Sequence, residues 1–255
     1  MEHITVVKVG GKVVEDRDSL QKLLEGFCAI KGHKLLVHGG GRLATTIGDQ
    51  LGIESKYING RRITDEETLK VVTMVYGGLV NKSIVASLQA LGCNAIGLTG
   101  ADMNVIEAHK RPVKDIDYGF AGDIDKVNAG LLADLIHKDV VPVMAPLTHD
   151  LNGGMLNTNA DTIASEVARA LTEFYDVSLV YCFEKKGVLL DENDDGSVIG
   201  ELTRELYKRY VDEGRISGGM IPKLDNAYAS IDKGVKKVII TRSDLIHKNS
   251  GTTIL

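Results

Sequence analysis

The stretch Ile4-Thr5-Val6-Val7-Lys8-Val9-Gly10-Gly11 decides how this chain is expected to fold. Its apolar, largely β-branched residues predict a buried strand of an α/β sheet that ends at two glycines. Glycine lets backbone N–H groups approach a ligand that a Cβ would block, and anions are the natural ligands of such a turn. Taken alone, this stretch favours the ordinary alternative, in which Lys8 reaches solvent from an edge strand and the glycines form a simple turn.

The residues that follow repeat an alternation of helix and strand. A capping region at 16–19 precedes apolar residues at helical spacing, and a second strand is expected at 34–37. A second glycine turn, His38-Gly39-Gly40-Gly41, then opens another helix. This order of strand, helix, strand and helix predicts a parallel sheet with right-handed crossovers.

Two hairpins and one long helical region are expected outside this pattern. Asn59-Gly60 is typical of a two-residue hairpin turn between 57 and 63, and alternation predicts a hairpin off the main sheet at 105–122. Thr64 and Glu67 have the spacing of a capping box, which would begin the long helix. We expect Gly77-Gly78 to divide that region into two helices.

Composition excludes several classes of protein. The 255 residues are 44% hydrophobic and 25% charged, and the net charge of -5 with a pI near 5.8 argues against a nucleic-acid surface. Cys28, Cys93 and Cys182 show no disulfide or zinc spacing, which fits a reducing cytoplasm. Glu2 before a short apolar run, and no uninterrupted run near eighteen apolar residues, predict neither a signal peptide nor a membrane span.

Polar loops at expected strand ends and helix starts supply the groups that phosphoryl transfer needs. They contain Lys8 with its glycines, the 38–41 turn, the 157–161 loop ending in Asp161, and Lys223. Positive charge and N–H donors around a transferring phosphoryl group are the main requirements of that chemistry. Each part has an ordinary alternative: Asp161 could complement a helix dipole, and His38 is more often a hydrogen-bonding fixture than a base.

Arg61 and Arg62 also allow two interpretations. They could be solvated hairpin charges, or an arginine here could grip an α-carboxylate with both ends of its guanidinium.

Two nucleotide-binding motifs are excluded. The triple glycine is not the G-x-G-x-x-G fingerprint, and the run from Gly77 to Ser83 has Asn81 where a P-loop requires its second glycine.

Five motifs in a fixed order carry a resemblance that covers essentially the whole chain. They are Val7-Lys8-Val9-Gly10-Gly11, Val37-His38-Gly39-Gly40-Gly41, Asn59-Gly60-Arg61-Arg62-Ile63-Thr64, Leu156-Asn157-Thr158-Asn159-Ala160-Asp161 and Gly219-Met220-Ile221-Pro222-Lys223. In these motifs the chain resembles the amino acid kinase superfamily, and within it the kinases that act on N-acylglutamates. The resemblance implies a three-layer αβα sandwich with a mostly parallel sheet, of the carbamate kinase-like kind.

The same resemblance implies the activity and the roles of residues. The implied activity is ATP-dependent phosphorylation of the γ-carboxylate of an N-acyl-L-glutamate, with N-acetylglutamate as the expected acceptor, in arginine biosynthesis. Lys8, Lys223 and Asp161 would be catalytic, with Asp161 holding both lysines. Gly40, Gly41, Arg62 and Asn157 would bind the acyl-amino acid. The nucleotide would be bound by Gly10, Gly11, Glu184, Lys185, Gly187, Val188, Ile216, Ser217 and Lys223.

The resemblance also implies the partners and the organisation of the chain. Mg²⁺ would be held mainly by the ATP phosphates, so no protein metal site is expected. An N-terminal lobe at about residues 1–172 would hold the acyl-amino acid and a homodimer contact, and a C-terminal lobe at about 173–255 would hold ATP. Arginine-inhibited members of the superfamily carry an extra N-terminal helix that builds a hexamer. Because Lys8 lies too close to Met1 to leave room for that helix, we expect an arginine-insensitive dimer. Neither nucleic acid nor membrane is an expected partner.

Three segments depart from the pattern of the superfamily. They are Phe183-Glu184-Lys185-Lys186, where a small hydroxyl residue and Asp are usual, Ser217-Gly218-Gly219, and the loop at 99–104, which lacks a usual lysine and paired glycines. Nucleotide preference and the acyl group therefore stay open. The alternatives are an N-succinylglutamate kinase, a kinase for an N-acylated aminoadipate, and a silent nucleotide- or amino-acid-binding regulator.

Overall fold

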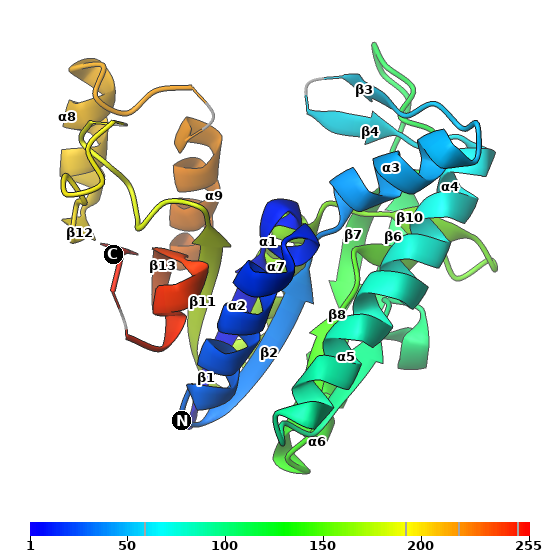
Figure 1. The fold of residues 1–255 in the computed structure, drawn as a ribbon, viewed down its shortest axis with the longest axis horizontal. Coiled ribbons are helices and arrows are strands. Elements are labelled where there is room, and N and C mark those ends of the chain that lie inside the picture. The colour runs from blue at the N-terminus through cyan, green and yellow to red at the C-terminus, as the bar shows by residue number, and fades with distance from the viewer. Residues whose placement is uncertain (59, 192, 219, 249) are drawn as a thin grey trace.

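The computed structural model describes residues 1–58, 60–191, 193–218, 220–248 and 250–255. Asn59 of the expected hairpin turn and Gly219 of the fifth motif lie outside the described residues. In the described part, an eight-stranded sheet runs through the molecule in the order β12-β14-β13-β11-β1-β2-β8-β5 (Figure 1). Its strands are β1 (His3–Val9), β2 (His33–His38), β5 (Ala95–Leu98), β8 (Val141–Met144), β11 (Asp176–Phe183), β12 (Glu201–Leu202), β13 (Lys237–Arg242) and β14 (Thr252–Ile254).

Strand β1 lies at the centre of this sheet, parallel to β2 on one side and β11 on the other. Its side chains alternate between two cores, because successive residues of a strand point to opposite faces. Ile4 and Val6 pack with helix α7 (Ala160–Leu171), whereas Val7 and Val9 pack with helix α2 (Arg17–Ala29). The β13–β14 pair is antiparallel, whereas most of the sheet is parallel. Because helices pack on both faces of this mostly parallel sheet, the predicted αβα sandwich is confirmed.

The other helices complete the two outer layers and the connections between strands (Figure 1). They are α1 (Gly11–Glu15), α3 (Gly41–Gln50), α4 (Glu66–Val72), η1 (Thr73–Val80), α5 (Asn81–Ala90), η2 (Asp102–Asn104), α6 (Ala129–His137), α8 (Arg204–Asp212), α9 (Met220–Asp232) and η3 (Ser243–Lys248).

The long helical region differs from its prediction in two respects: its N-cap residue and its division at Gly77-Gly78. The N-cap is Asp65, whose side chain accepts a hydrogen bond from the Thr68 N–H, so the helix begins one residue later than a Thr64 cap would place it. Gly77-Gly78 does not divide the helix, because α4, the π-helical η1 and α5 follow one another without interruption. A Cβ at Gly77 would stand 3.4 Å from the Leu147 side chain, so glycine here permits close packing.

By length and composition alone, the helix at Glu66–Ala90 could cross a membrane, with a hydropathy of 1.4 in its most apolar window. A core helix passes the same test. Val71, Val72, Ile84 and Leu88 of this helix are buried in the core that α2 and β2 share. We therefore interpret it as a core helix.

The smaller sheets lie at the upper edge of the main sheet in Figure 1, beside α3 and α4. One has the order β10-β9-β6-β7, with β6 (Ile106–Lys110), β7 (Gly122–Val127), β9 (Leu147–His149) and β10 (Met155–Asn157). The hairpin expected at 105–122 is thus the antiparallel β6–β7 pair, extended by two further strands. The other is the hairpin of β3 (Lys56–Ile58) and β4 (Arg61–Ile63).

Candidate active site

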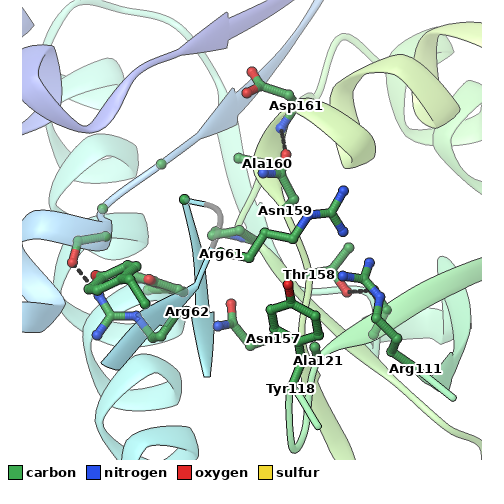
Figure 2. A pocket seen from close by; sticks show the side chains of 18 of the residues that line it. Arg61, Arg62, Arg111, Tyr118, Ala121, Asn157, Thr158, Asn159, Ala160 and Asp161 are labelled. Atoms are coloured by element: carbon green, nitrogen blue, oxygen red, sulfur yellow. Dashed lines mark hydrogen bonds between the residues drawn. The ribbon is translucent and has the colours of Figure 1, made fainter. Parts of the chain in front are cut away.

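A cavity of about 220 Å³ opens where β1, β2, β4 and the start of α7 meet (Figure 2). The loops after parallel strands converge at this edge of the sheet, which is where open α/β sheets bind ligands. Six residues predicted from the sequence line it together: Lys8, Gly40, Gly41, Arg62, Asn157 and Asp161. The structure therefore brings together the predicted catalytic and acyl-amino-acid groups, except Lys223.

At one end of the cavity, Lys8 faces Asp161. Lys8 is 7% exposed, and its Nζ lies 2.7 Å from Asp161 Oδ1. Asp161 stands in the first turn of α7, where the Asn159 side chain caps the helix by accepting from the Asp161 and Thr162 N–H groups. The contact is an ion pair by distance, although Oδ1 accepts no aligned hydrogen bond from the described residues. The cap fixes the carboxylate beside a nearly buried ammonium.

Lys223 approaches the same region from α9 but contacts an aromatic ring instead of Asp161. Its Nζ lies 4.0 Å from the centroid of Phe183, and Lys8 Nζ lies 5.8 Å from that centroid. Burial lowers the Lys223 pKa, and the charge of Asp161 raises it. Within the described residues Lys223 makes no ion pair, so the structure shows Asp161 holding Lys8 only. The expectation that Asp161 positions both lysines stays a prediction.

The two glycine turns predicted at the ends of β1 and β2 pack against each other. A Cβ at Gly39 would stand 3.2 Å from the Gly11 amide nitrogen. Gly40 has a φ of 154°, and a Cβ there would stand 3.2 Å from the Tyr76 ring. Side chains at these positions would push the turns apart, so glycine is required for their close approach.

Arg62 closes the other end of the cavity from β4. It is 8% exposed, and its guanidinium donates to Gly41 O at 2.6 Å, to Thr45 Oγ1 at 2.9 Å and to Ser55 Oγ. The guanidinium carbon also lies 4.7 Å from the Tyr57 ring centroid. No carboxylate among the described residues pairs with it. A buried cation held by neutral groups favours an anionic ligand, because burying an unpaired charge is costly.

Two further predicted residues have mainly supporting contacts. Asn157 donates from Nδ2 to Thr64 Oγ1 at 2.9 Å, which fixes its amide at the cavity wall. His38 is fully buried, and burial lowers its pKa to about 4. Its Nδ1 lies 2.7 Å from Gly39 O, and its Nε2 lies 3.1 Å from Asn81 Nδ2. A neutral ring that donates to Gly39 and accepts from Asn81 fits the hydrogen-bonding fixture favoured from the sequence.

The residues predicted to bind nucleotide are spread over a wider area. Gly10, Gly11 and Glu184 line a second cavity of about 270 Å³ beside the first, and Glu184 pairs with Lys12 at 3.1 Å. The others lie along the segments after β11 and before α9: Lys185 is exposed, Gly187 packs against Thr252, Val188 and Ile216 are core residues, and Ser217 is exposed. None of these five lines either cavity.

Arg111 and Tyr118, which line the first cavity, were not found by sequence reasoning. They lie in the connection between β6 and β7, outside all five predicted motifs, and the pairing of that sheet brings them to the site. Among the described residues, no group of three His, Cys, Asp or Glu side chains is arranged to hold a metal ion.

A lysine and two glycine turns at the ends of parallel strands, a second lysine on α9 and a buried arginine are the arrangement expected of a small-molecule kinase. The model of the amino acid kinase family matches residues 3–242. An acetylglutamate kinase from Bacteroides thetaiotaomicron is 68% identical over 99% of this chain and 98% of that protein, and one from Parabacteroides distasonis is 65% identical over 100% of both. The solved structure of smu.665 from Streptococcus mutans has a TM-score of 0.76 at 27% identity and covers 98% of each chain. The chain belongs to the amino acid kinase family.

Proposed function

We propose that this protein transfers the γ-phosphoryl group of ATP to the γ-carboxylate of N-acetyl-L-glutamate, a step of arginine biosynthesis. The observation that carries the proposal is the placement of two cations, Arg62 and Lys8, at opposite ends of one cavity. An N-acylglutamate has two carboxylates, and Arg62 and Lys8 provide one cation for each end of the molecule. The names of the relatives that are 65–68% identical support the same acceptor.

The chemistry needs little from the protein beyond position and charge. Arg62 would pair with the α-carboxylate, while Gly40, Gly41 and Asn157 hold the rest of the amino acid. An oxygen of the γ-carboxylate attacks the γ-phosphorus, the bond to the β,γ-bridging oxygen breaks, and ADP leaves with that electron pair. The nucleophile is already an anion, so no residue must remove a proton. The product is an acyl phosphate.

The residues around Lys223 fit a polyphosphate. Lys223 is a half-buried cation for which no described residue supplies an ion pair, and the Gly10–Gly11 turn adjoins it through Phe183 and Glu184. We infer that Lys8 and Lys223 share the charge of the transferring phosphoryl group. Mg²⁺ would be held chiefly by the phosphates. Glu184, Lys185, Gly187, Val188, Ile216 and Ser217 would bind the rest of the nucleotide.

We also infer the wider organisation of the enzyme. The acyl-amino-acid groups all lie before residue 172, and Phe183 and Lys223 lie after it, which supports two lobes that close over both substrates.

Met74 and Leu79 of the long helix are 55% and 51% exposed, and this apolar face supports a homodimer. A reducing cytoplasm suits the free Cys28, Cys93 and Cys182. Light scattering that gives a monomer or a hexamer would contradict the dimer.

The direct test is ADP release with MgATP and a panel of acceptors: N-acetylglutamate, N-acetylaminoadipate and free glutamate. We expect turnover of N-acetylglutamate, with the longer aminoadipate analogue at least about tenfold slower in kcat/KM, since one methylene is worth about 1–3 kcal/mol in a fitted pocket. A Lys8→Met variant is the matched inactive control. Binding of ATP without any ADP release would instead support a regulatory protein.

A further inference from the structure

We propose that Arg61 and Arg111 form a second carboxylate subsite in the same cavity, so that the enzyme prefers an N-acyl group that itself ends in a carboxylate, as succinyl does. The inference rests on the proposed function, because it concerns the acyl end of that acceptor. An acetyl group is neutral and would leave both arginines of this subsite without a ligand.

The cavity is lined by more cationic side chains than the two carboxylates of N-acetylglutamate need to contact. The cationic side chains are Lys8, Arg61, Arg62 and Arg111, and the lining includes one carboxylate, that of Asp161, which already pairs with Lys8. Arg62 and Lys8 are the two cations assigned to the two carboxylates of an acetylated glutamate. Asp123, just outside the lining, balances one of the remaining arginines. Among the described residues, Arg61 is then the lining cation that has neither an acidic partner nor a carboxylate of the glutamate part assigned to it.

Arg111 is held in place with donors to spare. Its Nε lies 3.1 Å from both carboxylate oxygens of Asp123, and its Nη2 lies 2.5 Å from Asp123 Oδ1. Its guanidinium carbon also lies 5.5 Å from the Tyr118 ring centroid. This pair lowers the pKa of Asp123 and raises that of Arg111, so both stay charged. The Asp123 contacts leave Nη1 free, and a guanidinium fixed from behind can present that edge to a ligand.

Arg61 is the less constrained partner. It precedes Arg62 on β4, and successive strand residues point to opposite sides. Arg62 is therefore buried under Gly41 while Arg61 extends into the middle of the cavity, toward Asn159 (Figure 2). No hydrogen bond or ion pair engages Arg61 within the described part of the chain. Its charge does contribute to lowering the Asp123 pKa, which places Arg61 and Arg111 in one electrostatic neighbourhood.

The loop at 99–104, where the sequence left the acyl group open, does not line the cavity. It is closed on itself, because the Thr99 N–H and hydroxyl both donate to Asp102 Oδ2, at 2.6 and 2.8 Å. The residues that can discriminate between acyl groups are instead Arg61 and Arg111 of the second carboxylate subsite. The acyl choice thus depends on a charge supplied by two separate segments.

The test compares three acceptors that share the glutamate part: N-succinylglutamate, N-acetylglutamate and N-butanoylglutamate. The butanoyl group matches succinyl in length but replaces the terminal carboxylate with a methyl group. We expect the wild-type enzyme to use N-succinylglutamate with a kcat/KM at least about tenfold above those of the other two, as charge-assisted hydrogen bonds would give. Arg61→Gln, on an exposed side chain, should lower the succinyl-to-acetyl ratio about tenfold or more.

Controls and a second measurement keep the outcomes separate. Arg17→Gln removes an exposed arginine of α2 that does not line the cavity and should leave the ratio unchanged. Calorimetry of the same acceptors reports binding even without turnover. If no N-acylglutamate is phosphorylated but N-succinylglutamate binds most tightly, the proposed function fails and the subsite stands. A wild-type ratio near one, or an Arg61→Gln ratio equal to that of the wild type, overturns the subsite.

Discussion

Arg62 offers the sharpest test of how the cavity holds its acceptor. Its guanidinium is 8% exposed, is fixed by three neutral acceptors, and has no carboxylate partner among the described residues. We therefore expect an acceptor carboxylate to complete its contacts. Arg62→Gln keeps a planar donor of smaller reach but removes the charge and one of the two parallel hydrogen bonds.

The size of the effect follows from those contacts. Each charge-assisted hydrogen bond is worth about 1.5–3 kcal/mol, and the glutamine amide recovers part of that. A net loss of about 3 kcal/mol corresponds to roughly a 150-fold weaker affinity for the N-acylglutamate. Arg62→Lys retains the charge but not the forked guanidinium, so its affinity for the acceptor should lie between those of the wild type and Arg62→Gln. ATP affinity should change less than about twofold, because the lost contact is with the acceptor.

Calorimetric titration of each variant with its acceptor and with MgATP measures both quantities. Arg17→Gln again serves as the control for a lost surface arginine. If Arg62→Gln weakens the acceptor less than about fivefold, or weakens ATP equally, then Arg62 does not bind the α-carboxylate and the assignment of that end of the cavity is wrong.

Three further perturbations follow from the site. Asp161→Asn removes the charge 2.7 Å from Lys8 and should lower kcat on the order of 10- to 100-fold with acceptor KM nearly unchanged; steady-state kinetics in which only KM rises would contradict this. Phe183→Leu removes the ring 4.0 Å from Lys223, a contact worth about 1–2 kcal/mol, so ATP turnover should fall about 5- to 20-fold, whereas Phe183→Tyr should retain it; equal losses would exclude the ring face as the cause. Burial lowers the folded-state pKa of His38 from 6.5 to about 4, so its contribution to stability is complete above pH 6.5 and is lost as the pH falls toward 4. Between pH 7 and 4.5 the wild type should lose about 2 kcal/mol more unfolding free energy than His38→Gln, and parallel denaturation curves would refute the buried neutral ring.

Local patterns predicted the parts of the site that lie next to strand ends. β-branched residues and glycines placed β1 and its turn correctly, and parallel topology then required the Lys8 and 38–41 segments to meet. The Asp161 segment follows β10 of the smaller sheet and joins them at the start of α7. Thr64 and Asp65 are both good capping residues, and Asp65 is the cap in the structure. Thr64 is engaged elsewhere, because its hydroxyl accepts from Asn157 and its backbone pairs with residues 118 and 120. The Gly77-Gly78 pair was misread for a similar reason, because propensity treats glycine as a breaker whereas packing against Leu147 uses its small size.

The parts that escaped prediction depend on contacts between distant segments. Arg111 follows an ordinary charged strand, and nothing nearby in the chain marks it as a cavity residue. Its place is set by β6–β7 pairing and by Asp123, twelve residues away. The face that Phe183 presents to Lys223 likewise joins residues forty positions apart. Such contacts arise from topology, which a single sequence does not encode in any local pattern.

The most direct test of the account is to trap the product. Hydroxylamine converts an acyl phosphate into a hydroxamate, so the purified protein is incubated with MgATP, an N-acylglutamate and hydroxylamine, beside a Lys8→Met control. We expect the wild type to form the γ-hydroxamate of the N-acylglutamate in step with ADP, and the variant to form neither product. ADP formed without hydroxamate, or no ADP from any N-acylglutamate, would contradict phosphoryl transfer to the γ-carboxylate.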